Sequence, residues 1–145
     1  MYIDNDSYKK IVETMPILTI DFLIKRPNWD DEVLLVKRNY EPLKDKWWVP
    51  GGRLRKNEDM RVAIDRLLFE EVGIMSEDVK DCQFECFFQF MDDKSRWGCS
   101  THTVSLLFEV KLNKEPIILL DDQSTEYKYG PIPIKLMQWI LVSQQ

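Results

Sequence analysis

The chain has 145 residues, 44% of them hydrophobic and 31% charged, which suits one globular domain with a core of its own and leaves no room for a second. Its formal net charge of −5 gives no broad basic surface, so we expect no nucleic-acid partner. No apolar run approaches a membrane span and the polar N-terminus does not resemble a signal peptide, so we expect a cytoplasmic domain over residues 1–145 with no membrane partner.

The first half of the chain combines a short helix with extended segments. Residues 7–13 fit a helix, after which an apolar, β-branched run at 17–25 predicts a strand. The turn-like sequence RPNWDD separates it from a second such run at 32–38, so the two predict a hairpin. Residues 46–50 predict a third short strand that leads into a turn at Gly51 and Gly52.

The second half begins with a helix and continues with another hairpin. Residues 83–90 and 102–110 are apolar enough for two buried strands, joined by a polar connection. Residues 121–130 predict a loop with a small strand, and a proline then opens a last helix through 134–142. Mixed strands with one central and one terminal helix predict an α/β fold, an α/β/α sandwich with a mixed central sheet.

The central helix lies in the segment from Gly52 to Ile74. Asp59 is suited to cap its start, and Gly73 stands where it would end. At about 100° per residue, one stripe faces the core and another flank carries two acidic side chains. The core stripe comprises Ile64, Leu68 and Val72, and the flank comprises Leu67, Glu70 and Glu71.

The two glutamates near the end of this helix need a cation. Carboxylates there are unfavourable because they face the negative pole of the helix dipole. A hard divalent ion with oxygen ligands would offset them, and the backbone of Gly51 and Gly52 is close enough in sequence to contribute a carbonyl. The alternative is a solvated face on which Arg66 pairs with Glu70.

The same segment has the spacing of a Nudix box, G-x5-E-x7-R-E-U-x-E-E-x-G-U, where U is a bulky aliphatic residue. Its matching residues are Gly52, Glu58, Arg66, Glu70, Glu71, Gly73 and Ile74. One position departs from the pattern, because Leu67 replaces the first glutamate after the arginine. So many matches at fixed spacing favour metal binding over a solvated face.

Over nearly its whole length the chain resembles the GDP-mannose mannosyl hydrolases, a branch of the Nudix family that also lacks the glutamate replaced by Leu67. The segments with counterparts in that branch are LTIDF, LLVKR, KWWVPGGR, the box itself, STHTVSL and DDQSTEYKY. The resemblance implies hydrolysis of GDP-mannose or GDP-glucose to GDP and free sugar, with attack at C1 of the sugar. It also implies Mg²⁺ or Mn²⁺ as cofactor and a homodimer.

The resemblance also implies roles for particular residues around the diphosphate. The expected metal ligands are the Gly51 carbonyl, Glu71 and Gln123, with Glu70 as an additional candidate. Arg38 and Arg53 are expected to be catalytic, because a forked guanidinium binds phosphate oxygens and stabilises the GDP leaving group.

Substrate binding is expected at the N-terminus and on the first strand. Tyr8 matches a position that contacts the guanine base in the family, and Tyr2 and Ile3 lie nearby in sequence. Asp21 is a charged residue in an apolar strand, so it either points to solvent or binds a ligand, and the resemblance favours sugar hydroxyls, with Arg38 beside them. The lone His102 is expected to be structural.

The main departure from that branch is Ser124. Its members carry a histidine, the general base, immediately after the metal-binding glutamine, whereas this chain has Ser124 after Gln123. Loss of a general base typically lowers a rate by about 10²- to 10⁴-fold. Asp121, Asp122 or Glu126 could substitute.

Two other functions remain open. One is a Nudix pyrophosphohydrolase that cleaves a P–O bond of another nucleoside diphosphate derivative, which the box glutamates support. The other is a non-catalytic nucleotide-sugar binder, which Leu67 and Ser124 favour.

The cysteines do not indicate zinc or disulfides, because Cys82, Cys86 and Cys99 have no CxxC spacing, and we expect small, mostly buried thiols.

Overall fold

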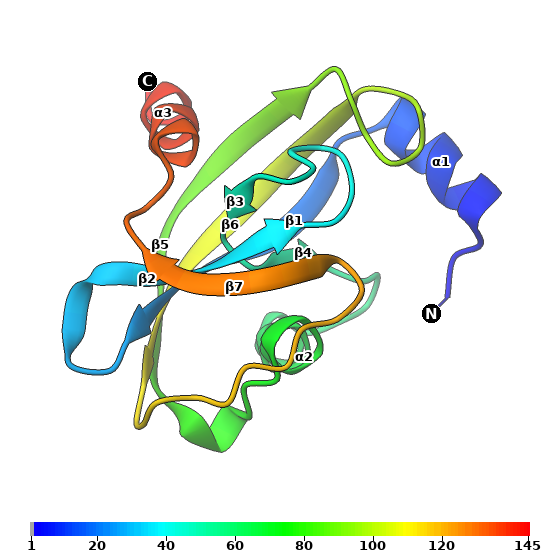
Figure 1. Ribbon diagram of the computed structural model, residues 1–145. Helices are drawn as coiled ribbons and strands as arrows, with labels where there is room; N and C mark the ends of the chain where they lie inside the picture. The colour runs from blue at the N-terminus through cyan, green and yellow to red at the C-terminus, as the bar shows by residue number, and fades with distance from the viewer. Residues whose placement is uncertain (1) are drawn as a thin grey trace.

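The computed structural model describes residues 2–145 (Figure 1). The elements in chain order are α1 (Asn5–Thr14), β1 (Ile17–Arg26), β2 (Trp29–Arg38), β3 (Trp47–Trp48), β4 (Gly51–Arg53), α2 (Met60–Val72), the 3-10 helix η1 (Ser76–Asp78), β5 (Val79–Asp92), β6 (Thr101–Leu112), β7 (Ser124–Gly130) and α3 (Ile134–Ser143). Within residues 2–145, no helix has the length and apolarity needed to cross a membrane.

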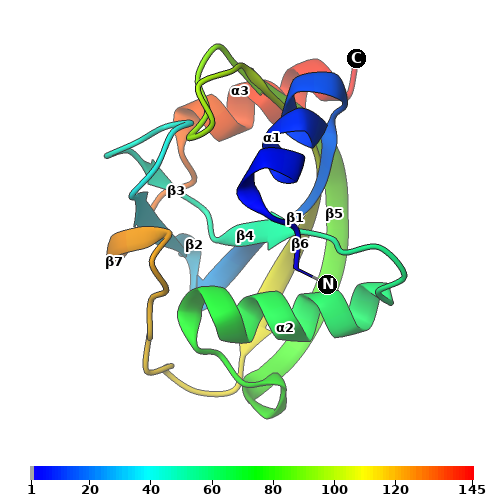
Figure 2. The same cartoon turned by 90° about the vertical axis from the view of Figure 1, so that its right-hand side faces the viewer.

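The predicted α/β/α sandwich with a mixed sheet is confirmed. Figure 2 shows α2 on one side of the strands and α1 and α3 on the other. One buried cluster packs Ile20, Phe22 and Ile24 of β1 against α2. A second cluster packs Leu23 of β1, with β5 and β6, against Leu136 of α3. Successive residues of β1 therefore contribute to opposite layers, as the alternation of side chains along a strand requires.

The strands divide between two groups that share only β1. β1 runs parallel to β6 and antiparallel to β4, while β6 pairs antiparallel with β5. β2 pairs instead with β3 and β7. The predicted first hairpin is confirmed only beside its turn, where Lys25 is opposite Val33 and Arg26 is opposite Trp29. Beyond these pairs the two strands bond to different neighbours.

Several predicted element boundaries change. The second hairpin is confirmed, but β5 and β6 extend to 14 and 12 residues. The small strand predicted within 121–130 is confirmed as β7, which has seven residues and pairs with β2. The first helix begins earlier than predicted because Asp4 caps it, accepting a hydrogen bond from the Ser7 amide at 3.0 Å.

The predicted turn at Gly51 and Gly52 is wrong, because these residues form the strand β4 and pair with β1. Neither glycine has positive φ. The glycines are needed instead because β4 lies very close to β1 and to α2. A Cβ at Gly51 would collide with the Asp21 carboxylate and the Ile20 carbonyl, and one at Gly52 would lie 2.6 Å from Leu67 Cδ2.

The helix α2 begins and ends where predicted. The Asp59 carboxylate accepts a hydrogen bond from the Arg61 amide, and Gly73 adopts the left-handed conformation, with φ of 75°. The predicted core stripe needs correction, because Ile64 is only partly buried while Leu67 is 2% exposed and packs in the core with Leu68 and Val72. The prediction that Leu67 lies on the acidic flank with Glu70 and Glu71 is therefore wrong.

The outer edge of β5 is closed along part of its length by the end of α3. The Ser143 hydroxyl accepts a hydrogen bond from the Gln89 amide at 2.8 Å. The Gln144 side-chain amide donates to the Phe87 carbonyl at 2.7 Å. These two side chains satisfy backbone groups that face away from β6.

The cysteines form no disulfide. Cys82, Cys86 and Cys99 are free thiols and only partly buried, which corrects the expectation that they would be mostly buried.

A partly buried ion pair fixes the loop between β4 and α2. Arg66 donates to both Glu58 carboxylate oxygens, at 2.6 and 2.9 Å, and also to the Arg53 carbonyl at 3.0 Å. The Glu58 carboxylate accepts a further bond from the Arg55 amide at 3.0 Å. The same arginine therefore holds the loop, the last residue of β4 and the helix in one arrangement.

We expect Glu58→Gln to lower the free energy of unfolding at pH 7 by about 1.5–3 kcal/mol, since it removes charge-assisted hydrogen bonds. The hydrogen bonds from Arg66 lower the Glu58 pKa from 4.5 to about 2. A lowered folded-state pKa stabilises the fold above pH 4.5, and this contribution is lost as the pH falls toward 2. Urea unfolding at pH 7 and pH 3 should therefore show a smaller difference from wild type at pH 3. The exposed Glu85→Gln is the control, and an equal deficit at both pH values would contradict the assignment.

We expect Leu67→Glu, which restores the consensus glutamate, to destabilise the metal-free protein by about 2–4 kcal/mol, because the carboxyl group would be buried among apolar side chains. Leu67→Met is the volume-matched control and should cost less than about 1.5 kcal/mol. Urea unfolding in the presence of EDTA measures both. Equal stability of Leu67→Glu and wild type would mean that this side chain can reach solvent.

Candidate functional site

A cavity of about 760 Å³ lies between α1, the sheet and the last turns of α2. Its floor comes from β1, β5 and β6, and its walls include α1 and the connections that follow β2 and β5. It is lined by most of the residues predicted from the sequence, namely Tyr2, Ile3, Tyr8, Asp21, Arg38, Gly51, Arg53, Glu70, Glu71 and Gln123. Ser124 is the exception. The fold therefore brings together residues from six separate segments in one cavity.

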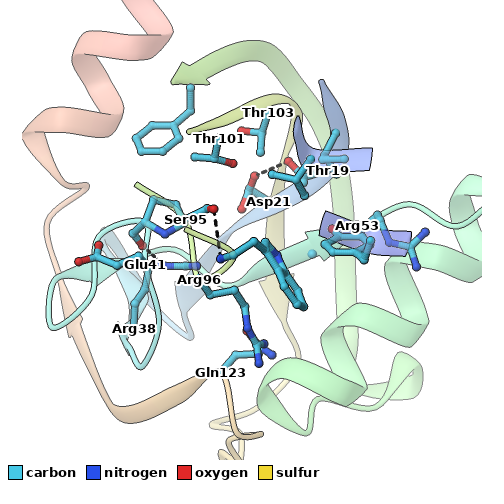
Figure 3. A pocket seen from close by; sticks show the side chains of 18 of the residues that line it. Thr19, Asp21, Arg38, Glu41, Arg53, Ser95, Arg96, Thr101, Thr103 and Gln123 are labelled. Carbon is cyan, nitrogen blue, oxygen red and sulfur yellow. Dashed lines mark hydrogen bonds between the residues drawn. The ribbon is translucent and has the colours of Figure 1, made fainter. Parts of the chain in front are cut away.

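The cavity floor has polar side chains on β1 and β6, whereas β5 contributes Phe88 and Phe90. Asp21 accepts hydrogen bonds from Ser105 on β6 and, at 3.2 Å, from Thr19 on β1. Figure 3 shows Thr101 and Thr103 at the same end of the cavity as Asp21 and Thr19. Asp21 thus neither points to solvent nor lacks partners, and its second oxygen remains available to a ligand.

Burial controls the protonation of Asp21. Removal from water raises its pKa to about 6, against the opposing effects of the bonds from Ser105 and Thr19 and of the Arg38 charge. The carboxyl group therefore lies near the boundary between its two states at neutral pH. It can accept hydrogen bonds from hydroxyl groups when ionised, and donate one when protonated.

Two carboxyl groups meet where α2 reaches the cavity. Burial raises the pKa of Glu71 to about 9, and the neighbouring Asp121 adds to this shift. Burial also raises the pKa of Asp121. Two adjacent carboxylates repel each other, so each such group disfavours ionisation of the other unless a cation lies between them. Asp121 was considered only as a substitute base, and its contact with Glu71 was not predicted.

The donor set suits a hard divalent cation. Glu71 and Asp121 provide carboxylate oxygens, and the Gly51 carbonyl and the Gln123 side-chain amide also line the cavity. Within residues 2–145, no group of three or more His, Cys, Asp or Glu side chains is arranged to hold a metal. A cation here would therefore need backbone, amide or substrate oxygens in addition to the carboxylates.

Glu70 makes the interactions of an ordinary surface residue. Its carboxylate pairs with Arg66 at 3.0 Å, as the solvated-face alternative predicted, and with Arg55 at 3.6 Å. It lines the cavity but is exposed. As a metal ligand it would have to exchange these arginines for the cation.

Arg38 and Arg53 reach the cavity without a carboxylate partner. The Arg38 side chain is held by a hydrogen bond from Nε to the Pro42 carbonyl at 2.7 Å. Burial lowers its pKa, while Asp21 and Glu71 oppose this shift. The Arg53 guanidinium lies 5.6 Å from the centre of the Tyr8 ring. Within residues 2–145, the ion pairs of the structure include neither arginine, so both retain donors for an anion.

Register explains why the segment before β7 reaches the site. Arg38 on β2 is opposite Ser124 on β7, and the Asn39 amide donates to the Gln123 carbonyl at 2.8 Å. This pairing directs Gln123 and Asp121 into the cavity and leaves Ser124 outside its lining. Of the other candidate bases, Glu126 pairs with Lys37 at 2.9 Å and Asp122 is exposed. Asp121 alone of these acids lines the cavity.

Sequence reasoning missed several residues of the site. Ser105 and Thr103 alternate with apolar residues on β6, which could have indicated a polar sheet face. Arg96 and Trp97 line the cavity from the connection between β5 and β6. The sequence alone assigns these two residues only to the polar connection between the two strands. His102, expected to be structural, hydrogen-bonds the Gln89 side chain at 3.0 Å and lies outside this cavity.

Comparison with known proteins agrees with the fold. Residues 18–134 match the family model for the NUDIX domain. The chain is 32% identical over 128 residues to the low-salt glycan biosynthesis protein Agl8 of Haloferax volcanii, a match that covers 87% of this chain and 78% of that protein.

Solved structures show the same fold. A MutT NUDIX hydrolase from Burkholderia pseudomallei superimposes with a TM-score of 0.67 at 21% identity, covering 88% of this chain and 97% of that one. A bifunctional NMN adenylyltransferase/ADP ribose pyrophosphatase from Francisella tularensis, complexed with AMP and a Mn ion, superimposes with a TM-score of 0.61 at 25% identity, covering 92% of this chain.

Some of these structures are longer proteins. The chain spans 39% of the Francisella protein. It spans 57% of a MutT/nudix family protein from Enterococcus faecalis, with 90% of this chain covered, a TM-score of 0.63 and 20% identity. The match of the family model over most of the chain, together with the box on β4 and α2, establishes that this chain belongs to the Nudix family.

Proposed function

We propose that the protein hydrolyses a nucleoside diphosphate sugar, GDP-mannose or GDP-glucose, to GDP and free sugar by attack at C1. The observation that carries this proposal is the division of one cavity into two chemical environments. One end has hydroxyl side chains around Asp21, which suits the hydroxyls of a sugar. The other has two unpaired arginines beside two carboxyl groups, which suits a diphosphate with a metal ion.

The arginines suit stabilisation of the leaving group. When the C1–O bond breaks, negative charge develops on the β-phosphate, and Arg38 and Arg53 would donate hydrogen bonds to it. Because Arg38 is partly buried and fixed by the Pro42 carbonyl, its guanidinium would need little reorganisation during the reaction. Tyr8 would hold the base beside Arg53, where the two side chains are already in contact.

Glu71, Asp121, Gln123 and the Gly51 carbonyl would hold Mg²⁺ or Mn²⁺, with Glu70 as an additional ligand if it leaves its arginine partners. The bound cation would supply positive charge next to the diphosphate. The raised pKa values of Glu71 and Asp121 support this assignment, because a cation would relieve the repulsion between the two carboxylates.

The burial of Leu67 supports cleavage at carbon over cleavage at phosphorus. Many Nudix enzymes use a carboxylate of this helix to activate water, whereas here the first of those positions is an apolar core residue. Asp121 is the acid best placed to accept a proton from water, while Ser124 lies outside the cavity lining. The name of the Haloferax relative refers to glycan biosynthesis, which is consistent with a sugar nucleotide as substrate.

A second candidate is cleavage of a P–O bond in another nucleoside diphosphate derivative. The observation that favours it is the pair of carboxyl groups, since Asp121 next to Glu71 provides an acidic group that could replace the missing glutamate. A third, binding without turnover, follows from the absence of the histidine at Ser124.

We also propose a homodimer. Large apolar side chains are exposed at the N-terminus and on β5, including Tyr2 at 87%, Phe84 at 55% and Phe87 at 43%. A two-fold interface would cover them. Light scattering at micromolar concentrations should give twice the monomer mass, and a monomer throughout that range would reject the proposal.

We expect Glu71→Gln to weaken binding of GDP in the presence of Mg²⁺ by about 10-fold or more, because removal of a ligand charge weakens the metal site. Stability should change less, since the glutamine relieves the repulsion by Asp121. Calorimetry with and without Mg²⁺ measures the first effect and urea unfolding the second. The surface change Glu77→Gln is the control. Equal metal-dependent affinity in Glu71→Gln and wild type would remove Glu71 from the metal site.

We expect the oxygen of water to enter the sugar. Incubation with GDP-mannose and Mg²⁺ in oxygen-18 water should give labelled mannose and unlabelled GDP, because attack at C1 leaves every phosphate oxygen in place. Mass spectrometry of the products distinguishes the candidates. Label in GMP or in mannose phosphate would establish cleavage at phosphorus, and tight binding without any product would support the non-catalytic alternative.

A further inference from the structure

A stack of aromatic and cationic side chains runs along one side of the cavity, and four of its five members line it. In order it contains Arg53, Tyr8, Trp97, Arg96 and Tyr40. The Arg53 guanidinium lies 5.6 Å from the Tyr8 ring centre, and the Tyr8 and Trp97 ring centres are 5.4 Å apart. The Arg96 guanidinium lies 5.0 Å from the Trp97 ring centre and 4.0 Å from that of Tyr40. These five residues come from four separate segments.

Backbone and hydroxyl contacts fix the position of Arg96. Its amide donates to the Glu41 carbonyl at 3.0 Å, which joins the β5–β6 connection to the β2–β3 connection. The buried Ser95 hydroxyl accepts from the Trp97 amide at 3.2 Å. Figure 3 shows Arg96 and Ser95 among the side chains of the cavity, with Glu41 close by. The segment is therefore tied to the β2–β3 connection by the first bond and held internally by the second.

Arg96 has free donors toward an anion. Rings that cover the faces of a guanidinium leave its N–H groups available at the edge, where phosphate oxygens bind. Within residues 2–145, none of the ion pairs involves Arg96, although it lines a cavity with several acidic residues. A solvated arginine near such acids would ordinarily pair with one, so its orientation by Tyr40 and Trp97 needs another explanation.

We propose that Arg96 binds the diphosphate of the substrate and that Tyr40 is a positioning residue that orients it. This inference deepens the proposed function, because it concerns the same cavity and the same class of ligand. Arg96 adds a third guanidinium to Arg38 and Arg53. Tyr40 contacts Arg96 but does not line the cavity, so it acts only through that arginine.

The test compares the affinities of Arg96→Met and wild type for GDP and for ADP, each with Mg²⁺, by calorimetry. We expect Arg96→Met to raise the Kd by about 10-fold, the effect of one lost charge-assisted hydrogen bond. Arg96→Lys should recover part of the affinity, since it keeps the charge but not the planar fork. Arg26→Met is the matched control, because Arg26 also covers an aromatic ring, at 5.1 Å from the Tyr129 centre, but lies outside the cavity.

A double-mutant cycle separates positioning from a structural role. Tyr40→Leu should weaken GDP binding in the wild-type background and have no effect in Arg96→Met. Equal effects in both backgrounds would overturn the role of Tyr40. Unchanged affinity in Arg96→Met, or a wild type that binds neither nucleotide, would overturn the inference. If wild type binds both nucleotides but hydrolyses no GDP-sugar, the proposed function fails, while a loss of affinity in Arg96→Met would still support a diphosphate contact.

Discussion

The site depends on the close approach of β4 to β1 and α2, which the absence of side chains at Gly51 and Gly52 permits. A Cβ at Gly51 would occupy the space of the Asp21 carboxylate. One at Gly52 would displace Leu67. Because both contacts involve backbone or packed groups, neither could relax cheaply. The acid on β1, the end of α2 and the first arginine after the glycines are near each other as a result.

This arrangement concentrates polar groups at the expense of stability. Asp21, Glu71 and Arg38 all have pKa values displaced by burial in the direction of the neutral form. Such displacements show that the protein environment disfavours the charged states. The Glu58–Arg66 pair is different, because its hydrogen bonds stabilise the charged form and hold the adjacent loop. The Glu58–Arg66 ion pair therefore stabilises the fold, whereas the charged groups of the neighbouring cavity would be stabilised by a bound ligand.

The sequence was informative where structure is local. Asp59 and Gly73 mark the ends of α2 through interactions within a few residues, so the helix could be predicted closely. β4 could not be recognised in the same way, because Gly51 and Gly52 are needed for close approach to Asp21 and Leu67, which lie 30 and 15 positions away in the sequence. Leu67 was assigned to the acidic flank of α2, although it lies in the core. Helical periodicity alone does not reveal how much of the helix surface the sheet covers.

The electrostatic contacts of the site could not be predicted from the sequence, because they also depend on long-range pairing. Asp121 meets Glu71 only because β7 pairs with β2 in one particular register. Arg96 and Tyr40 are far apart in sequence and are brought together by two connections whose conformations no periodic pattern describes. Most of the site residues predicted from the sequence line the cavity, but none of them lies in the β5–β6 connection.

The end of α3 restricts how two copies of the chain could associate. A strand from a second molecule that extended the sheet at β5 would need the Phe87 carbonyl and the Gln89 amide, and both already bond to α3 side chains. Sheet extension along this stretch would first require release of the helix terminus. Association through the exposed aromatic side chains leaves these backbone groups undisturbed, so a dimer should join faces of the molecule and not continue its hydrogen-bonded ladder.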